Sequence, residues 1–127
     1  MKTFPQASGA LLRVAYVALF AWFGAQQLLD PSAWVGFLPE WTGYFPIPGE
    51  MLVQLNGLLE LCLAALLALG VFTRPIAAFL ALHLLGIAIS AGGATGVRDA
   101  GLAAIGIALA LNQPDRWTLD TRNTSSK

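Results

Sequence analysis

Charge and cysteine are both scarce in this chain of 127 residues. Only 11% of the residues are charged, whereas a soluble domain usually carries about 25%. The formal net charge is zero, which argues against nucleic acid or another polyanion as a partner. The single cysteine, Cys62, excludes an internal disulfide and a Cys-x-x-Cys redox pair. With one histidine, His83, beside that one cysteine, the chain alone cannot build a conventional metal cage, and we predict no metal site.

Motifs of soluble enzymes are missing as well. The sequence has no Walker loop, no Rossmann fingerprint, no zinc-spaced set of Cys and His, and no Cys-x-x-Cys-His haem motif. We see no cleavable signal peptide, because Arg13 interrupts the first apolar run and no convincing small-x-small cleavage site follows it. We therefore expect the first run to be a retained membrane span.

What the chain does have is hydrophobic residues, which make up 57% of it and gather in four long segments. A helix needs ~20 apolar residues to cross the hydrocarbon of a bilayer. The expected spans are 9–29, 50–72, 75–91 and 97–112, with a polar tail at 114–127. The segments are too continuous for the alternating strands of a barrel, and only helices or barrels satisfy the backbone in lipid. The sequence predicts an all-α membrane protein, a single domain built as a four-transmembrane-helix bundle.

Two further patterns concern the packing and the orientation of these helices. Small residues recur at spacings that allow close helix contact: Ala18, Gly24, Ala25, Ala64, Ala68, Ala100, Ala104 and Ala108. In the four-span arrangement nearly all Lys and Arg residues, from Lys2 to Lys127, fall on one side, and only Arg98 falls on the other. The positive-inside rule then places both termini in the cytoplasm. We expect the end of the tail, 123–127, to be disordered.

The segment between the first two spans, Asp30 to Gly49, is rich in aromatic residues and proline. Its aromatic residues are Trp34, Phe37, Trp41, Tyr44 and Phe45. Trp and Tyr favour the headgroup region of a bilayer, and the prolines prevent a long helix. We expect an interfacial loop on the outer surface with one helical turn at Ser32–Phe37. It serves either as a simple anchor or as a lid over a cavity between the helices.

Glu60 is the residue that most needs a physical reason, because it lies near the middle of the second span. A carboxylate there costs roughly 2.5 kcal/mol or more unless it is paired, protonated or next to a polar cavity. Asn56 lies one turn away on the same helix face. The polar positions expected in the outer half of the membrane are Gln26 or Gln27, Asn56, Glu60, Arg98 and Asp99, with His83 at the deep end.

Each of these residues also has a purely structural explanation. Arg98 and Asp99 can mark the membrane edge and neutralise each other, and Arg13 can extend its charge to the nearby interface. His83 can serve as a hydrogen-bonding group between helices. Glu60 can form a structural pair with Arg98, Asn56 or His83, or it can bind a polar ligand head or exchange a proton.

Several fragments, taken in order, resemble the DoxX family of small four-helix bacterial membrane proteins. The stretch NGLLELCLAALLALGVFTRP matches the family's Gly-x-x-Glu, Leu-Gly and Thr-Arg positions at Gly57, Glu60, Gly70, Thr73 and Arg74. FGAQQLLDP ends the first span, VRDAGL carries the basic–Asp pair, and QPDRWTLD is similar to the family's ending. In that ending Gln113 and Asp115 stand where the family has glycine.

The resemblance implies a multi-pass protein of the bacterial cytoplasmic (inner) membrane. Some DoxX relatives are membrane subunits of thiosulfate:quinone oxidoreductases, and others associate with redox or sulfur-handling enzymes. This implies a redox connection, a quinone as the candidate ligand, and Glu60, Arg98 and Asp99 as the matching polar positions. The implied partners are the lipid bilayer, a redox enzyme or another membrane subunit, and a second copy of the chain.

Three functions follow as hypotheses, and whether the chain is an enzyme stays open. In the first, it supports a quinone-linked redox system: Glu60 exchanges a proton, and a ligand-binding set surrounds it. That set consists of Gln26, Gln27, Asn56, His83, Arg98, Asp99, Trp34 and Trp41. In the second, the chain is a non-catalytic structural or assembly subunit of a membrane complex. The third, a small-solute carrier, requires an oligomer, and the sequence shows no inverted repeat of the transporter kind.

Overall fold

The computed structural model describes residues 3–125. Every regular secondary-structure element within these residues is a helix. Four long helices dominate: α1 (Thr3–Leu29), α2 (Gly49–Leu69), α3 (Thr73–Ala91) and α4 (Gly93–Leu111). Each is long and apolar enough to cross a membrane, which confirms the predicted all-α, four-helix architecture. Three short helices complete the described chain: η1 (Pro31–Phe37), η2 (Glu40–Tyr44) and α5 (Leu119–Ser125).

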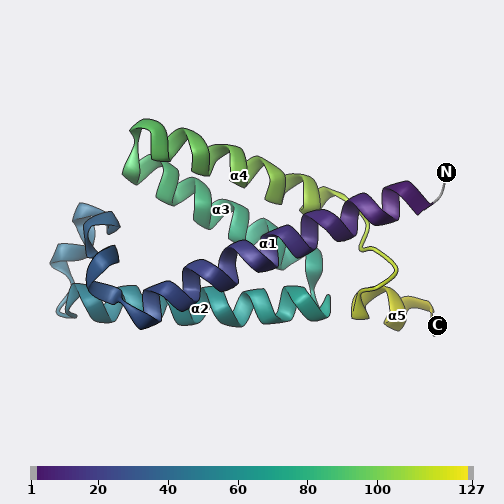
Figure 1. Ribbon diagram of the computed structural model, residues 1–127, viewed down its shortest axis with the longest axis horizontal. Helices are drawn as coiled ribbons and strands as arrows, with labels where there is room; N and C mark the ends of the chain where they lie inside the picture. The colour runs from purple at the N-terminus through teal and green to yellow at the C-terminus, as the bar shows by residue number, and fades with distance from the viewer. Residues whose placement is uncertain (1–2, 126–127) are drawn as a thin grey trace.

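The four helices form two pairs, α1 packed on α2 and α3 packed on α4. Figure 1 shows that the pairs lie close together near the chain ends and diverge toward the opposite end. We call the end with the N- and C-termini the termini end, and the end with η1 and η2 the loop end. Contacts between the pairs are fewer than those within them, so the space between the pairs widens toward the loop end.

Glycines let the backbones of each pair approach closely. A Cβ on Gly24 would lie 2.7 Å from the carbonyl oxygen of Gly57, and one on Gly57 would lie 2.8 Å from that of Gly24. In the other pair, a Cβ on Gly96 would lie 2.7 Å from the carbonyl oxygen of Ala88. Small residues therefore set the helix spacing, as expected for membrane helices.

The expected contact face of α4 was wrong. Its three alanines at four-residue spacing, Ala100, Ala104 and Ala108, are exposed. The buried face of this helix is instead Gly96, Asp99, Ala103, Gly106 and Leu109. A regular spacing of small residues does not show which side of the helix they occupy, and alanine is also common on faces toward lipid.

The hydrophobic core fills the termini half of the bundle, where all four helices meet. Tyr16 and Phe20 of α1 pack edge to face with ring centroids 5.3 Å apart. The Tyr16 hydroxyl donates a hydrogen bond of 2.6 Å to the carbonyl oxygen of Leu102 on α4. The Tyr16 ring fills the space where Gly106 lacks a side chain. This contact ties α1 to α4 across the gap between the pairs.

The helix boundaries differ from the expected spans for local reasons. α2 ends at Leu69 rather than at residue 72, because Gly70 adopts φ 75° and closes the helix with bonds to Leu66 and Leu67. The same glycine lies against Thr118, whose side chain would overlap any Cβ at this position. α4 begins at Gly93, before the expected residue 97, because Gly92 and Gly93 both adopt positive φ and make a tight turn.

The tail turns back onto the α2–α3 connection. The Asp120 carboxylate accepts hydrogen bonds from the backbone N–H groups of Phe72 and Thr73, at 2.9 and 2.8 Å, and so caps α3. Asp120 N–H in turn donates to the carbonyl of Gly70 at 3.0 Å. Of the residues expected to be disordered, 123–125 belong to α5, and 126–127 lie outside the described residues.

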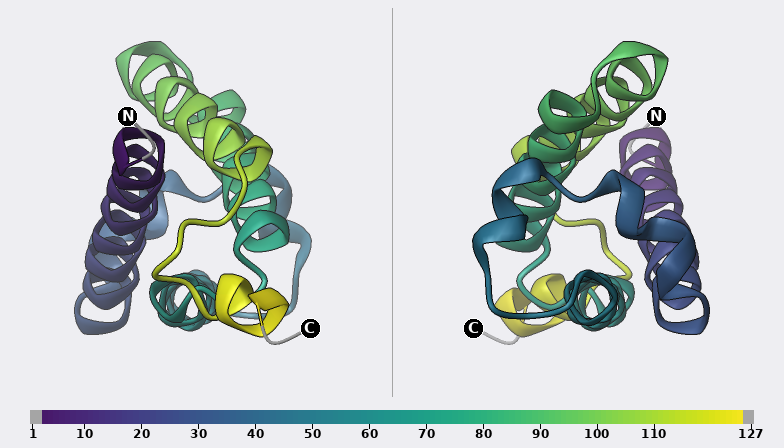
Figure 2. Two further views of the ribbon diagram at one scale, coloured as in Figure 1. Left: turned by 90° about the vertical axis from the view of Figure 1, so that its right-hand side faces the viewer. Right: turned by 90° about the vertical axis from the view of Figure 1, so that its left-hand side faces the viewer.

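The segment between α1 and α2 arches across the loop end of the bundle, in front of α3 (Figure 2, right). Its first part, η1, contacts α1, α2 and α3. Trp34 of η1 packs edge to face on Phe23 of α1, with centroids 5.4 Å apart. The loop is therefore fastened to the helices through η1.

Candidate intramembrane polar site

The Glu60 side chain lies in the interior of the bundle and is only 3% exposed. Gln27 Nε2 donates to Glu60 Oε2 at 2.9 Å, and Asn56 Nδ2 donates to Glu60 Oε1 at 3.0 Å. His83 Nε2 lies 3.1 Å from the same Oε1. The acid in the middle of α2 thus has hydrogen-bond partners on α1, α2 and α3, which together compensate its removal from water.

Local geometry explains how these side chains meet. Asn56 precedes Glu60 by four residues, so both side chains leave the same face of α2. The close contact of Gly24 with Gly57 holds the end of α1 against α2 and places Gln27 beside Glu60. On α3, His83 stacks on Phe79 one turn earlier, with ring centroids 6.3 Å apart and planes inclined by 8°.

Hydrogen bonds to the backbone determine which way the two amides point. Gln27 Nε2 also donates to the carbonyl oxygen of Phe23 at 3.1 Å, and a carbonyl can only accept. Gln27 Oε1 is thereby directed at Asn56 Nδ2, 2.7 Å away. Both N–H bonds of each amide are then used, and each amide presents a donor to Glu60. Both oxygens of Glu60 therefore accept a hydrogen bond from an amide.

The polar cluster forms part of the wall of a cavity of about 920 Å³ between the helix pairs, toward the loop end. All four long helices and the loop contribute to its lining. A cavity of this size falls in the range of small-molecule sites, which are typically apolar with a few oriented polar groups. The lining here is of that kind: Leu, Ile, Phe and Trp side chains surround Glu60, Asn56 and His83.

The two glutamines at the end of α1 have different environments. Gln27 is buried and bonded to Glu60, whereas Gln26 is half-buried and lines the cavity. The Gln26 side chain makes no hydrogen bond to any other residue that the structure describes, although its backbone carbonyl accepts one from Asp30 N–H. The sequence placed both glutamines at the same depth and did not decide which of them contacts Glu60. The rotation of α1 about its axis turns Gln27 toward Glu60.

Arg98 and Asp99 line the cavity from α4 and pair with each other. Arg98 Nε donates to Asp99 Oδ1 at 3.2 Å, and the Asp99 side chain is buried while that of Arg98 is 59% exposed. Within the described residues, Arg98 forms no ion pair with Glu60. Of the expected ligand set, Trp34 and Trp41 also line the cavity, both from the loop.

A second polar cluster lies at the termini end, and here the expectation for Arg13 was wrong. Its side chain does not extend to the interface but is buried, with Nε 3.0 Å from Asp115 Oδ2. Arg13 Nη1 also donates to the carbonyls of Leu67 and Ala68, at 3.2 and 2.8 Å. Both belong to the last turn of α2, where carbonyls lack the usual i+4 partner, and the Leu67 carbonyl also accepts the closing bond from Gly70 N–H. The partner, Asp115, stands where the resembling family has glycine, so the sequence alone did not point to it.

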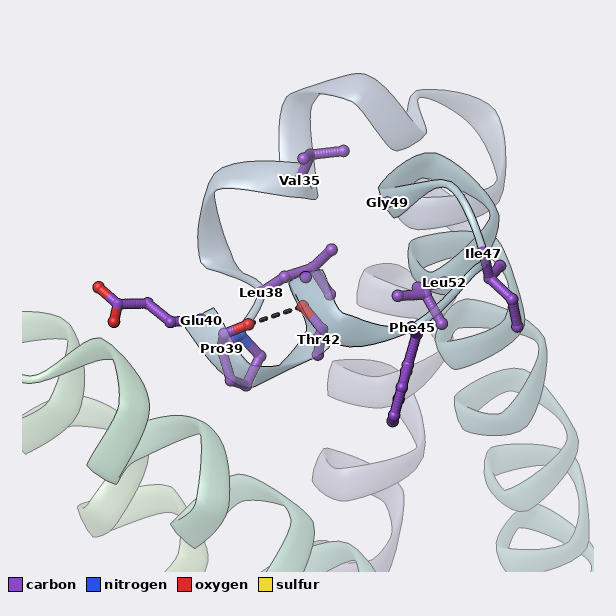
Figure 3. A pocket seen from close by; sticks show the side chains of 10 residues that line it. Val35, Leu38, Pro39, Glu40, Thr42, Phe45, Ile47, Gly49 and Leu52 are labelled. Carbon is purple, nitrogen blue, oxygen red and sulfur yellow. Dashed lines mark hydrogen bonds between the residues drawn. The ribbon is translucent and has the colours of Figure 1, made fainter.

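A smaller pocket of about 400 Å³ lies between η1, η2 and the start of α2 (Figure 3). Leu38, Phe45 and Leu52 supply apolar walls, while the Glu40 carboxylate extends away from the other side chains. Thr42 Oγ1 is bonded to the carbonyl of Pro39 at 2.6 Å. Among the described residues no group of three or more His, Cys, Asp or Glu side chains could hold a metal ion.

Comparison with known proteins gives the family. A family model described as DoxX matches residues 9–93, which is more than half of the chain and includes the whole Gln27–Asn56–Glu60–His83 cluster. No curated protein and no solved structure matches the chain. The matched range covers α1 from residue 9 onward and all of α2 and α3. With four helices able to span a bilayer, this chain belongs to the DoxX family and is a multi-pass bacterial membrane protein.

Proposed function

We propose that this DoxX protein supports a quinone-linked redox system through the polar site around Glu60. The observation that carries the proposal is an ionisable side chain in the wall of a cavity of about 920 Å³ that is otherwise mainly apolar. A quinone has a flat ring with polar oxygens and an apolar tail. A cavity with aromatic and aliphatic walls and a polar end suits both parts of such a ligand.

The residues divide into three roles. Glu60 exchanges a proton at the polar end of the cavity. Gln26 and Arg98 have hydrogen-bond donors available for the oxygens of the ligand, since the Gln26 side chain has no hydrogen-bond partner in the described chain and Arg98 uses only Nε for Asp99. Trp34 and Trp41 contact the apolar part from the loop side. Asp99, which is buried, positions Arg98.

The orientation in the bilayer is part of the proposal. Arg13, Arg74, Arg116 and Arg122 all belong to the termini end, and Arg98 lies toward the loop end. The positive-inside rule then puts the termini in the cytoplasm and the cavity in the outer half of the membrane. Reporter fusions to the C-terminus and within η2 test this directly: the C-terminal fusion should report cytoplasm and the η2 fusion the opposite side.

Binding of decylubiquinone to the purified protein tests the function. For Glu60→Gln we expect affinity to fall about tenfold or more, which corresponds to ~1.4 kcal/mol. The matched control is Glu50→Gln, which changes an exposed carboxylate in the first turn of the same helix and outside the cavity lining. Equal affinities for the wild type and Glu60→Gln would contradict a role of this acid in ligand binding.

The second candidate is a non-catalytic assembly subunit, and one observation favours it. Both carboxylate oxygens of Glu60 already have hydrogen-bond partners within the chain, so the acid can serve packing alone. Under this alternative, Glu60→Gln lowers the stability of the protein and its recovery with a stoichiometric membrane partner, while quinone binding is undetectable even in the wild type.

A further inference from the structure

We propose that His83 is the proton-relay residue of this site, passing a proton between Glu60 and the cavity. The inference deepens the proposed function and rests on it for the ligand that exchanges the proton. It follows from the hydrogen-bond partners of Glu60, from the place of His83 in the cavity wall, and from the state of its second ring nitrogen.

Of the described residues bonded to the Glu60 carboxylate, His83 alone can exchange a proton with it. Gln27 and Asn56 both present N–H groups to the carboxylate, and neither amide nitrogen accepts a proton. The orientation of both amides follows from the bond of Gln27 to the Phe23 carbonyl, so they cannot be turned around without losing that bond. His83 Nε2, 3.1 Å from Oε1, is the remaining partner, and it can either donate or accept.

Glu60 and His83 differ in their exposure. Glu60 is 3% exposed, whereas the His83 side chain is 22% exposed and lines the cavity. The second ring nitrogen, Nδ1, makes no hydrogen bond to any residue that the structure describes. Stacking on Phe79 holds the ring plane. His83 therefore has one nitrogen on the buried acid, a side chain in the cavity wall, and a second nitrogen without a hydrogen-bond partner among the described residues.

These positions define the transfer. In the resting state Glu60 is a carboxylate and His83 is a neutral ring with its proton on Nε2. A proton donor in the cavity gives one proton to Nδ1, while the Nε2 proton passes to Glu60 Oε1. The result is a carboxylic acid and a neutral ring with its proton on Nδ1. One proton has been taken up, no electron has moved, and the reverse transfer returns it.

Other charged groups around the cavity are few. α4 contributes Arg98 and Asp99, which pair with each other, and the loop contributes Asp30, which accepts a bond from Ser32. The part of α1 that lines the cavity contributes glutamine amides but no charged group. Within the described residues, none of these charged side chains forms a hydrogen bond with Glu60 or His83, so none competes with His83 as the proton partner of Glu60.

The resting state can be tested without any ligand, because the chain has a single histidine. ¹⁵N NMR of the protein in detergent, purified without a histidine tag, gives one imidazole signal set. We expect a neutral ring protonated at Nε2. A ring protonated at Nδ1 alone, or at both nitrogens, would overturn the proposed starting state.

The transfer itself can be followed by time-resolved infrared spectroscopy after a jump from neutral to acidic pH. The carboxylic-acid band absent from Glu60→Gln belongs to Glu60. Because a positioned acid–base group typically accelerates proton transfer by ~10²–10⁴-fold, we expect this band to rise about 100-fold more slowly in His83→Gln. The control is Cys62→Ser, an exposed position two residues from Glu60, which should match the wild type. An unchanged rate in His83→Gln would overturn the relay.

A chemical rescue removes the ambiguity of a folding defect. In His83→Ala, free imidazole added to the solution should restore a large part of the rate if the ring acts as a proton carrier, and failure of rescue in a folded variant would count against it. None of these measurements uses a quinone. If decylubiquinone fails to bind the wild type while the relay measurements hold, the proposed function fails and the relay stands.

Discussion

Gln27 Nε2 lies 2.9 Å from Glu60 Oε2, so the last turn of α1 donates directly to the acid in the middle of α2. The bond forms because α1 and α2 cross at Gly24 and Gly57, where either backbone would obstruct a side chain on the other. Helix packing and the polar site therefore depend on each other. The first two predictions separate the two contributions.

Replacing Gln27 by alanine should destabilise the protein. It removes a donor from a buried carboxylate and leaves the Phe23 carbonyl and Asn56 Nδ2 each without one partner. A loss of ~1–3 kcal/mol is expected for an unsatisfied buried group. Gln26→Ala is the matched control, since Gln26 is half-buried and has no such bonds. Thermal unfolding in detergent measures both, and equal melting temperatures for the two variants would contradict the role of Gln27.

Gly24→Ala should separate α1 from α2. The new methyl group would lie 2.7 Å from the Gly57 carbonyl oxygen and 2.8 Å from Leu61 Cγ, so one helix must move. Overpacking of this kind typically costs ~1–3 kcal/mol. Gly101→Ala on α4 is the control, because a Cβ there meets nothing within 4 Å. Unfolding by SDS titration should show a loss of stability for Gly24→Ala only. An unchanged stability of Gly24→Ala would refute the close crossing.

The sequence was sufficient for part of the site and not for the rest. Asn56 and Glu60 are four residues apart in one apolar helix, so their contact follows from helical geometry. His83 could be placed at the same depth from its position in the third span. Neither argument gives the rotation of a helix about its axis. That rotation decides that Gln27 rather than Gln26 meets Glu60, and that Arg98 pairs with Asp99 instead.

The termini end shows a different limit of sequence reasoning. Arg13 and Asp115 are 102 residues apart, and their contact depends on the path of the tail after α4. No periodicity predicts that path. Arg13 near the start of an apolar run is equally compatible with an interfacial anchor, and only the tertiary structure shows that the tail supplies its partner.

Removal of either member of the Arg13–Asp115 pair should be strongly destabilising. Both side chains are nearly inaccessible, at 7% and 2% exposure, so each single change leaves a buried charge without its partner. Breaking such a pair typically costs ~3–5 kcal/mol. We expect the double variant, Arg13→Leu with Asp115→Leu, to lose less stability than the two single variants lose in sum. A double-mutant cycle measures the coupling, and strict additivity would contradict it.

Asp120 should contribute a pH-dependent part of the stability. Partial burial by itself raises the pKa of its carboxyl, but the hydrogen bonds from Thr73 and Phe72 outweigh it, so the pKa lies below its usual value. Because the folded-state pKa is lowered, this stabilisation is present above the unfolded pKa of about 3.9 and is lost as pH falls through the folded value.

Asp120→Asn should reduce this loss of stability on acidification and lower the stability near neutral pH, where the charged cap of α3 is missing. Melting temperatures measured across the acidic range test the prediction. The control is Asp30→Asn, an exposed carboxylate that accepts its bond from Ser32. Identical pH profiles for the wild type and Asp120→Asn would show that the cap contributes nothing.

The most direct test of the central claim is photolabelling with an azidoquinone, followed by mass spectrometric mapping of the labelled residues. If the space between the two helix pairs is the quinone site, label should appear on cavity-lining, half-buried residues of α1 and α3, such as Phe23 and Ile87, and unlabelled quinone should compete for it. Labelling confined to outward-facing residues such as Leu55 and Leu59, unaffected by competition, would contradict the account.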